Sequence, residues 1–271
     1  MRFINRHPGR GGRWLLALLP LVLLLAVYGT ASSLRLAENP EDRLLPSAAQ
    51  MVDAVVRMAF TEDGRTGEYL FWSDTWASLL RLFLGVATAA VVGLFVGIAS
   101  GTFPMLRAPL SPMMAVVSMV PPLAILPILF IVFGLDELSK VMLIVIGIAP
   151  ILARDLEHRA REIPAEVIVK AQTLGANSWT VVLRVVLPQL LSRLLLSLRL
   201  MLGSAWLFLI SAEAISATSG LGYRIFLVRR YMSMDVILPY VAWITLLAWA
   251  MDFGLRWLNR VCFPWSEGNS R

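Results

Sequence analysis

The sequence holds very few of the residues from which enzymes build reactive or metal-binding sites. Among 271 residues there is one cysteine, Cys262, and there are two histidines, His7 and His158. A lone cysteine excludes a disulfide within the chain and a metal site made of cysteines. Neither histidine has the spacing of a zinc motif or the following aspartate that marks a membrane acyltransferase. We therefore expect no catalytic residue, no metal site and no enzyme activity in this chain.

A nucleotide-binding loop is also missing. The phosphate-binding Walker loop ends in Gly-Lys-Ser or Gly-Lys-Thr, whereas neither of the lysines, Lys140 and Lys170, follows a glycine. The segment Gly9–Arg13 is rich in glycine and arginine but lacks this pattern. We expect that this chain binds no cofactor.

Charged residues are scarce and apolar residues are abundant. The chain is 15% charged and 58% hydrophobic, with a mean hydropathy of +0.73, whereas soluble domains hold about 25% charged residues. A bilayer requires about 20 apolar residues per helix, which leaves room for about six spans. The basic pI of about 10.1 comes from residues dispersed between apolar segments. This pattern favours a multi-pass protein with a positive-inside topology and no nucleic-acid partner.

Six apolar segments are candidates for membrane spans. They are Trp14–Ser33, Trp76–Ser100, Leu110–Phe133, Ser139–Ala153, Leu187–Ile210 and Leu238–Leu258. We interpret the first as an uncleaved span, because its apolar core is longer than that of a usual signal peptide and Tyr28-Gly29-Thr30 is a poor cleavage site. In the third, Pro112, Pro121, Pro122 and Pro127 predict a kinked or discontinuous helix.

Two features of the second span concern its neighbours. Gly93 and Gly97 form a GxxxG pair, which allows close approach of another helix. The sequence leaves open whether that helix belongs to the same chain or to a second copy. A short turn at Thr102–Pro109, which carries Arg107, is expected to lead into the third span.

The polar stretch Asn39–Asp74 separates the first two spans. Within it, Ser47 is a plausible N-cap for a helix at Ala48–Phe60. Apolar residues of that helix share one face, and the stretch is rich in acidic residues. We expect an interfacial helix on the outer side of the membrane.

The positions of the basic residues predict the topology. The expected cytoplasmic parts hold Arg2, Arg6, Arg10, Arg13, Arg107, Arg154, Arg159, Arg161, Lys170, Arg184, Arg256, Arg260 and Arg271. Both termini are therefore expected inside. Arg224, Arg229 and Arg230 fall outside and are the exception. They could face the bilayer surface, a partner protein or an anionic substrate.

The segment Ile163–Pro188 stands out between the fourth and fifth spans. Its pattern predicts a short amphipathic helix, a turn at Gly175 and a second helical run closed by Leu187-Pro188. Pro164 suits a first helical turn, and Gly175 can adopt the positive φ that ends a helix. An apolar stripe for a partner groove is expected from Ile163, Val167, Ala171 and Leu174.

A helix lying flat on the membrane is the alternative interpretation of this segment. The polar face, however, carries Glu162, Glu166, Lys170 and Gln172. Lipid-binding helices are typically rich in lysine and arginine on that face. The mixed charges favour docking to a partner protein.

Around Gly175 the segment resembles the permease signature of bacterial ABC importers. That signature consists of Glu-Ala-Ala, three residues, Gly, nine residues, Ile, one residue and Leu-Pro. Aligned on Gly175, this chain has at the signature positions Val169, Lys170, Ala171, Val185, Leu187 and Pro188. Val169 and Lys170 thus replace the usual Glu-Ala.

The resemblance extends over about Leu44–Leu258, to the nitrate/sulfonate/taurine-type importer permeases. The matching pieces are Leu45-Pro46-Ser47, Ser78-Leu79-Leu80-Arg81, Pro121-Pro122-Leu123-Ala124, Phe133-Gly134-Leu135, Ala212-Glu213 and Ser219-Gly220-Leu221-Gly222-Tyr223. The resemblance implies an all-α membrane protein with the type I ABC importer permease fold, about six transmembrane helices and a cytoplasmic coupling helix. It also implies a bacterial inner-membrane location, a second permease copy, two cytoplasmic ATPase subunits that hold ATP and Mg, and a periplasmic binding protein.

The expected organisation follows from the spans and the resemblance. It comprises a cytoplasmic tail (1–13), a first transmembrane helix (14–34), a periplasmic segment with the interfacial helix (35–75), the permease core (76–258, with the coupling loop at about 154–186) and a cytoplasmic tail (259–271).

Two sets of residues are the candidate sites. For ATPase coupling they are Pro164, Glu166, Val167, Lys170, Ala171, Leu174, Gly175 and Ala176. For the translocation path, where ionisable groups inside a membrane are costly and usually functional, they are Arg81, Ser197, Arg199, Ser204 and Glu213. Arg199 could pair with a carboxylate or lend positive potential to an anion path.

The sequence thus predicts an ATP-driven importer of a small anion, such as a sulfonate, taurine or nitrate. A secondary carrier or channel that works without an ATPase is the alternative. A membrane-anchored assembly factor would leave the proline-rich third span unexplained.

Overall fold

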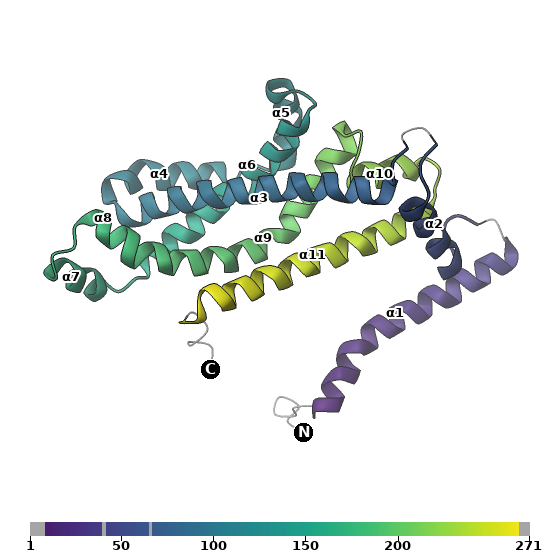
Figure 1. The fold of residues 1–271 in the computed structure, drawn as a ribbon, viewed down its shortest axis with the longest axis horizontal. Helices are drawn as coiled ribbons and strands as arrows, with labels where there is room; N and C mark the ends of the chain where they lie inside the picture. Colours follow the sequence, from purple (N-terminus) through teal and green to yellow (C-terminus); the bar gives the residue numbers. More distant parts are fainter. Residues whose placement is uncertain (1–8, 40–41, 65–66, 266–271) are drawn as a thin grey trace.

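The computed structural model describes residues 9–39, 42–64 and 67–265, and every regular element in these ranges is a helix. The helices are α1 (Arg10–Glu38), α2 (Ala48–Phe60), α3 (Leu70–Thr102), α4 (Pro104–Val117), α5 (Leu126–Phe133), α6 (Glu137–Arg161), α7 (Ala165–Thr173), α8 (Ser178–Val181), α9 (Leu187–Ser216), α10 (Leu221–Arg229) and α11 (Met234–Cys262). In Figure 1 the long helices run lengthwise, with α7 and α8 at one end and α2 and α10 at the other. The expected all-α fold is confirmed.

The centre of the bundle is the close pair α3 and α6. A Cβ added at Gly93 would lie 2.8 Å from the Cβ of Leu152, and one at Gly97 would lie 2.6 Å from that of Leu156. The GxxxG pair therefore packs against a helix of the same chain, which settles one of the two alternatives that the sequence left open. Helix α9 contacts α6 as well, so α6 lies between two neighbours.

Four helical stretches are long and apolar enough to cross a bilayer, or five if the bent pair α4 and α5 is one span. The described residues thus support fewer than the six spans expected. The difference lies in α6, which contains the expected fourth span Ser139–Ala153 but carries Lys140 near its start and Arg154 and Asp155 in its second half. Because α6 is buried between other helices, it does not need an apolar surface facing lipid.

The expected third span is discontinuous, as its prolines predict. Helix α4 ends at Val117, a 3-10 turn follows at Pro122–Ile125, and α4 lies at 83° to the segment that continues into α5. Figure 1 shows α5 projecting away from the long helices. Gly134, with φ +79, ends α5 and leads into α6.

The expected turn at Thr102–Pro109 is wrong. Phe103 alone separates α3 from α4, because Pro104 opens the first turn of α4 and proline fits that position. The Arg107 side chain folds back and donates to the backbone oxygens of Ser100 at 2.9 Å and Gly101 at 2.6 Å. It thereby caps free carbonyls at the end of α3.

The N-terminal helices differ in how they contact the bundle. Helix α2 has the predicted bounds, and Ser47 forms a capping box with Gln50, which confirms the predicted N-cap. Helix α1 stands away from the bundle in Figure 1, and 6% of its apolar window is buried. Tyr28 and Ser32 hold its last turns by donating to the backbone oxygens of Pro46 and Leu45 at 2.8 Å and 2.9 Å.

Candidate functional site

The segment between α6 and α9 has the predicted helix and glycine turn. Helix α7 ends at Thr173, Gly175 has φ +85, and Asn177 caps α8 by accepting from the backbone N–H of Thr180 at 2.8 Å. Glycine suits the residue at positive φ, because side chains with a Cβ are strained there. Pro164 lies one position before the predicted first turn, since it is the N-cap and α7 begins at Ala165.

The second helical run does not close at Leu187-Pro188. Helix α8 continues through the π-turn Val182–Val186 into α9, and the backbone N–H of Leu187 bonds to the oxygen of Val182. A π-turn widens the helix by one residue, which gives the ring of Pro188 room in a turn that an α-helix would crowd. The run from Ser178 to Ser216 is therefore one continuous helix with a proline inside it.

The four residues of the predicted apolar stripe do not share one exposed face. Ile163 is buried and Ala171 packs against the core, whereas Val167 is exposed and the side chain of Leu174 is 88% exposed. Trp179 on α8, which is 66% exposed, was not among the predicted coupling residues. Leu174 and Trp179 flank the glycine turn and are its most prominent apolar groups.

The other predicted coupling residues lie around this turn. Glu166 and Lys170 are exposed on α7, and Ala176 packs against the core. A cavity of about 510 Å³ separates this segment from the end of α3 and the start of α4, and Thr102 and Ile168 are among its lining residues. Helix α7 is thus an exposed element that touches the bundle along part of its length.

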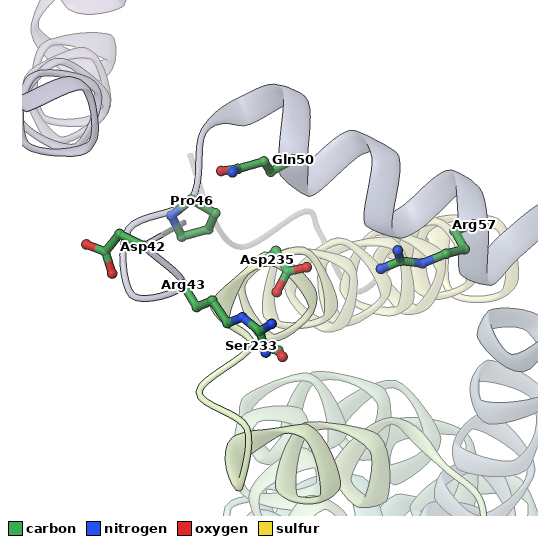
Figure 2. Close-up of a pocket in the computed structure, with 7 residues that line it drawn as sticks. All are labelled: Asp42, Arg43, Pro46, Gln50, Arg57, Ser233 and Asp235. Carbon is green, nitrogen blue, oxygen red and sulfur yellow. The ribbon is translucent and has the colours of Figure 1, made fainter. Parts of the chain in front are cut away.

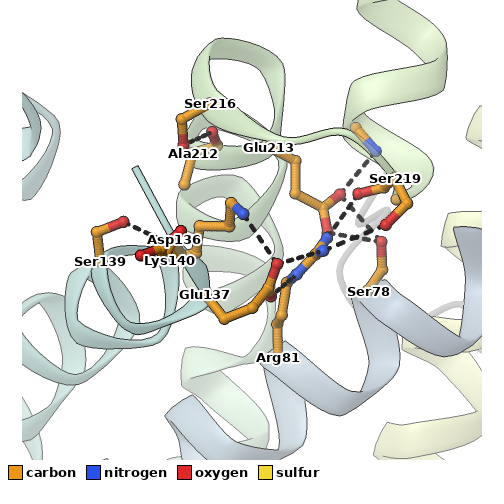
Figure 3. Close-up of polar contacts among 12 residues, drawn as sticks. Ser78, Arg81, Asp136, Glu137, Ser139, Lys140, Ala212, Glu213, Ser216 and Ser219 are labelled. Carbon is orange, nitrogen blue, oxygen red and sulfur yellow. Dashed lines mark hydrogen bonds and ion pairs between the residues drawn. The ribbon is translucent and has the colours of Figure 1, made fainter. Parts of the chain in front are cut away.

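At the opposite end of the bundle, a buried polar network is centred on Arg81 and Glu213 (Figure 3). The Arg81 guanidinium donates to Glu213 at 2.7 Å. The Glu213 carboxylate also accepts from the hydroxyl of Ser78 at 2.8 Å and from the backbone N–H of Gly222 at 2.9 Å. Because the buried charges are paired and hydrogen-bonded, the bundle can hold them.

The other edge of the Arg81 guanidinium faces Glu137, the first residue of α6. Nε donates to one carboxylate oxygen of Glu137, and Nη2 donates to the other at 2.9 Å. Lys140 donates to that second oxygen at 3.0 Å, and Nη1 of Arg81 reaches the backbone oxygen of Ser219 at 2.7 Å. Glu137 precedes the expected fourth span, and the hydrogen bond from Arg81 is the main cause that lowers its pKa from the ordinary value.

A second buried carboxylate, Asp74, holds the turn before α10. It accepts from the backbone N–H of Gly220 at 2.9 Å, from Nε of Arg224 at 2.7 Å and from the hydroxyl of Tyr240 at 3.3 Å. A Cβ at Gly220 would lie 2.6 Å from the carboxylate of Glu213, so glycine is required there. The ion pair with Asp74 directs Arg224 into its own chain. Arg229 also contacts its own chain, since its guanidinium lies 4.9 Å from the ring centre of Phe226.

Arg199 pairs with a carboxylate, which is one of the two roles the sequence left open. Its Nε donates to Asp252 on α11 at 2.8 Å, and Arg256 donates to the same carboxylate at 2.7 Å. Arg199 and Asp252 are both partly exposed. The pair links α9 to α11 on the side of the bundle.

The residues predicted for a translocation path do not converge on one cavity. Arg81 and Glu213 lie in the buried network, and Arg199 lies with Asp252. Ser197 donates to Asp155 and lines a cavity of about 210 Å³ between α6 and α9. Ser204 is half-buried on α9.

A polar pocket of about 500 Å³ lies near α2 and the start of α11 (Figure 2). Its lining residues are Asp42, Arg43, Pro46, Gln50, Arg57, Ser233 and Asp235. The backbone N–H of Met234 donates to the oxygen of Arg43 at 3.2 Å, which joins the loop before α2 to α11. The pocket thus combines basic and acidic side chains at one end of the molecule.

Sequence reasoning missed the partners of the embedded arginines. The carboxylates that pair with Arg81, Arg199 and Arg224 include, in that order, Glu137, Asp252 and Asp74. Lys140 joins the first of these pairs by binding Glu137. One signal was available, since Glu137 and Lys140 are three apart and therefore neighbours on a helix. The longer-range pairs had no signal in a single sequence.

Comparison with known proteins adds family information to this geometry. The profile described as "Binding-protein-dependent transport system inner membrane component" matches residues 89–266. The taurine transport system permease protein TauC of Escherichia coli (strain K12) is 35% identical over 247 residues, which cover 90% of this chain and 87% of that protein. The putative aliphatic sulfonates transport permease protein SsuC of Bacillus subtilis (strain 168) is 27% identical over 263 residues, or 97% and 92% of the two chains.

Among solved structures, an inward-facing conformation of the MetNI methionine ABC transporter shares the fold. The match has a TM-score of 0.63 at 20% identity and covers 74% of this chain and 99% of that chain. At this identity the likeness concerns the arrangement of helices alone.

Proposed function

This chain belongs to the family of binding-protein-dependent transport system inner membrane components, and we propose that it forms the path for a small anionic solute in an ABC importer. It is a permease, as its homologues for taurine and aliphatic sulfonates are. The similarity to the taurine permease over 90% of the chain carries the proposal. Both relatives are named for solutes with a sulfonate group, so a sulfonate or a similar small anion is the proposed cargo.

Energy for transport is proposed to come from two ATPase subunits that bind ATP and Mg in the cytoplasm. Two observations support this. The sequence has no glycine followed by lysine, as a Walker loop would require. Helix α7 and the turn at Gly175 form an exposed element to which an ATPase subunit can dock. Leu174 and Trp179 are the apolar groups for a partner groove, with Glu166 and Lys170 beside them. Val169, which replaces the glutamate of the signature, is exposed too.

A second copy of the chain is the proposed permease partner. Helix α1 is membrane-length yet mostly unburied, and α5 projects from the bundle with Ile131 and Val132 exposed. Lipid alone could cover α1. The exposed apolar surface of a broken helix is better covered by protein, since irregular backbone at membrane depth must be shielded from lipid.

We place α7 in the cytoplasm, together with both termini, and the polar network on the periplasmic side. The many basic residues near α7 support this orientation. The polar pocket near α2 then opens toward the periplasm and is the proposed contact for the substrate-binding protein. Its mixed charges suit the rim of a transient protein interface.

Reconstitution tests the proposal. The chain, its ATPase and its binding protein are reconstituted with lipid vesicles. Uptake of radiolabelled taurine is measured with ATP supplied on the side of the membrane that carries the ATPase. We expect uptake that requires all three proteins and stops when the ATPase carries a lysine substitution in its Walker loop. Uptake that persists without the ATPase would show a secondary carrier or channel instead.

A further inference from the structure

We propose that Arg81 and Lys140 form a binding site for the oxyanion group of the solute, and that the carboxylate of Glu137 occupies this site when no solute is bound. The inference rests on the proposed function, because it names the place where the transported anion is first held inside the chain. The site lies where α3, α6 and the turn before α10 meet (Figure 3).

The burial of the three groups differs sharply. The side chains of Arg81 and Lys140 are 5% and 3% exposed, whereas that of Glu137 is 63% exposed. Glu137 nevertheless provides the carboxylate that bonds to both cations. It is therefore the cover of the site, and its departure would open both cations to solvent.

Charge balance favours the exchange of one anion for another. On its inner side Arg81 is compensated by Glu213, which is fully buried and cannot leave without exposing a cation to an apolar surrounding. On its outer side Arg81 shares Glu137 with Lys140. Without Glu137 the two cations would face one carboxylate, so a net positive charge would remain for an incoming anion.

The geometry matches an oxyanion with two or three oxygens. Nε and Nη2 of Arg81 present a fork to the Glu137 carboxylate, and this fork binds carboxylates, phosphates and similar groups in the same bidentate way. Lys140 approaches one of these oxygens from another side. A sulfonate could place two oxygens on the fork and still reach the lysine.

Exchange also has a low cost on the side of Glu137. Its side chain is 63% exposed, so its release into solvent adds no desolvation cost, and an incoming oxyanion replaces the hydrogen bonds that the carboxylate gives up. The backbone before α6 turns at Gly134, whose φ of +79 is readily adopted by glycine. The Arg81 guanidinium, by contrast, stays fixed by Glu213 and the backbone oxygen of Ser219.

Direct binding to the full-length purified chain in detergent tests the inference. The probe is ethanesulfonate, and dimethyl sulfone is the uncharged comparison, with isothermal titration calorimetry as the readout. We expect Glu137→Gln to bind ethanesulfonate about tenfold more tightly than the unchanged protein, because the competing charge is removed. Dimethyl sulfone should bind to neither, and Asp53→Asn on the exposed face of α2 should leave the affinity unchanged.

Lys140→Met in the Glu137→Gln background should remove the gain in affinity. Equal affinity of Glu137→Gln and unchanged protein, or equal binding of dimethyl sulfone, would overturn the inference. If Glu137→Gln does not fold, Glu137→Asp is measured instead, because its shorter side chain keeps the charge but cannot reach both cations. It should also bind more tightly, and no gain would again refute the site. Since this assay contains no ATPase, its failure is separate from a failure of ATP-driven uptake.

Discussion

At the scale of single residues, the chain places most of its embedded charges in pairs. Arg81, Arg199 and Arg224 each have a carboxylate partner on another helix, at 2.7 Å or 2.8 Å. Such pairs are weak evidence for stability, but they become costly when one partner is lost. We therefore expect the buried charges of this bundle to fix the positions of the helices. Glu137 differs from them, because its side chain is largely exposed.

Neutralising Glu213 is expected to destabilise the protein strongly. Glu213→Gln would leave Arg81 without its buried counter-charge, and breaking a buried pair in this way costs about 3 to 5 kcal/mol. The loss can be measured by thermal unfolding of the purified chain in detergent. Asp53→Asn, an exposed carboxylate on α2, is the control and should unfold like the unchanged protein. A Glu213→Gln protein of ordinary stability would show that the network is not structural.

At the scale of elements, the segment from α7 to α9 joins a short helix to a long continuous one through a glycine turn. Gly175 stops α7, whereas α8, the π-turn and α9 form one continuous helix of 39 residues. Movement of α8 can therefore be transmitted along α9 to the end of the bundle where Glu213 lies. A closed second run, as the sequence predicted, would have lacked this direct connection.

Leu174 is expected to be needed for ATPase binding but not for folding. Its side chain is 88% exposed, so Leu174→Asp removes an apolar contact surface without opening a cavity in the bundle. We expect co-purification of the ATPase to fall by about tenfold or more, with the thermal midpoint of the chain unchanged. Leu135, 62% exposed in the loop between α5 and α6, gives the control Leu135→Asp, which should retain the ATPase. Normal ATPase recovery with Leu174→Asp would place the docking surface elsewhere.

At the scale of the whole molecule, the two ends of the bundle differ in chemistry. One end carries the helix α7 and the exposed apolar pair Leu174 and Trp179, and the other carries the polar pocket and the buried network. An importer needs this difference, because it receives solute on one side of the membrane and contacts its ATPase on the other. The orientation of the chain in the membrane decides which of the two ends faces the cytoplasm.

The native cysteine reports the orientation directly. Cys262 is exposed at the end of α11, and the proposed topology places it in the cytoplasm. A membrane-impermeant maleimide should leave it unlabelled in intact cells and label it after permeabilisation. The control is Asp53→Cys, at an exposed position on α2, in a Cys262→Ser background, which should react in intact cells. Labelling of Cys262 from outside would reverse the topology.

The sequence by itself determined the class of the protein and the position of its coupling segment. Hydropathy and proline spacing are local properties of the chain, so the long apolar helices, the break between α4 and α5, the cap at Ser47 and the turn at Gly175 were all predictable. The backbone conformation just before Leu187-Pro188 was not predictable, because the formation of a π-turn depends on how α9 packs and not on the residues alone.

Only the tertiary structure decided the partners of the charges and of the glycines. Arg81 and Glu213 are 132 positions apart, and Asp74 and Arg224 are 150 apart. One sequence cannot reveal which of several carboxylates meets an arginine, since the choice depends on how whole helices align. The same holds for Gly93 and Gly97, whose partner proved to be α6 of the same chain. Composition sets where a chain can lie, while packing sets which side chains meet there.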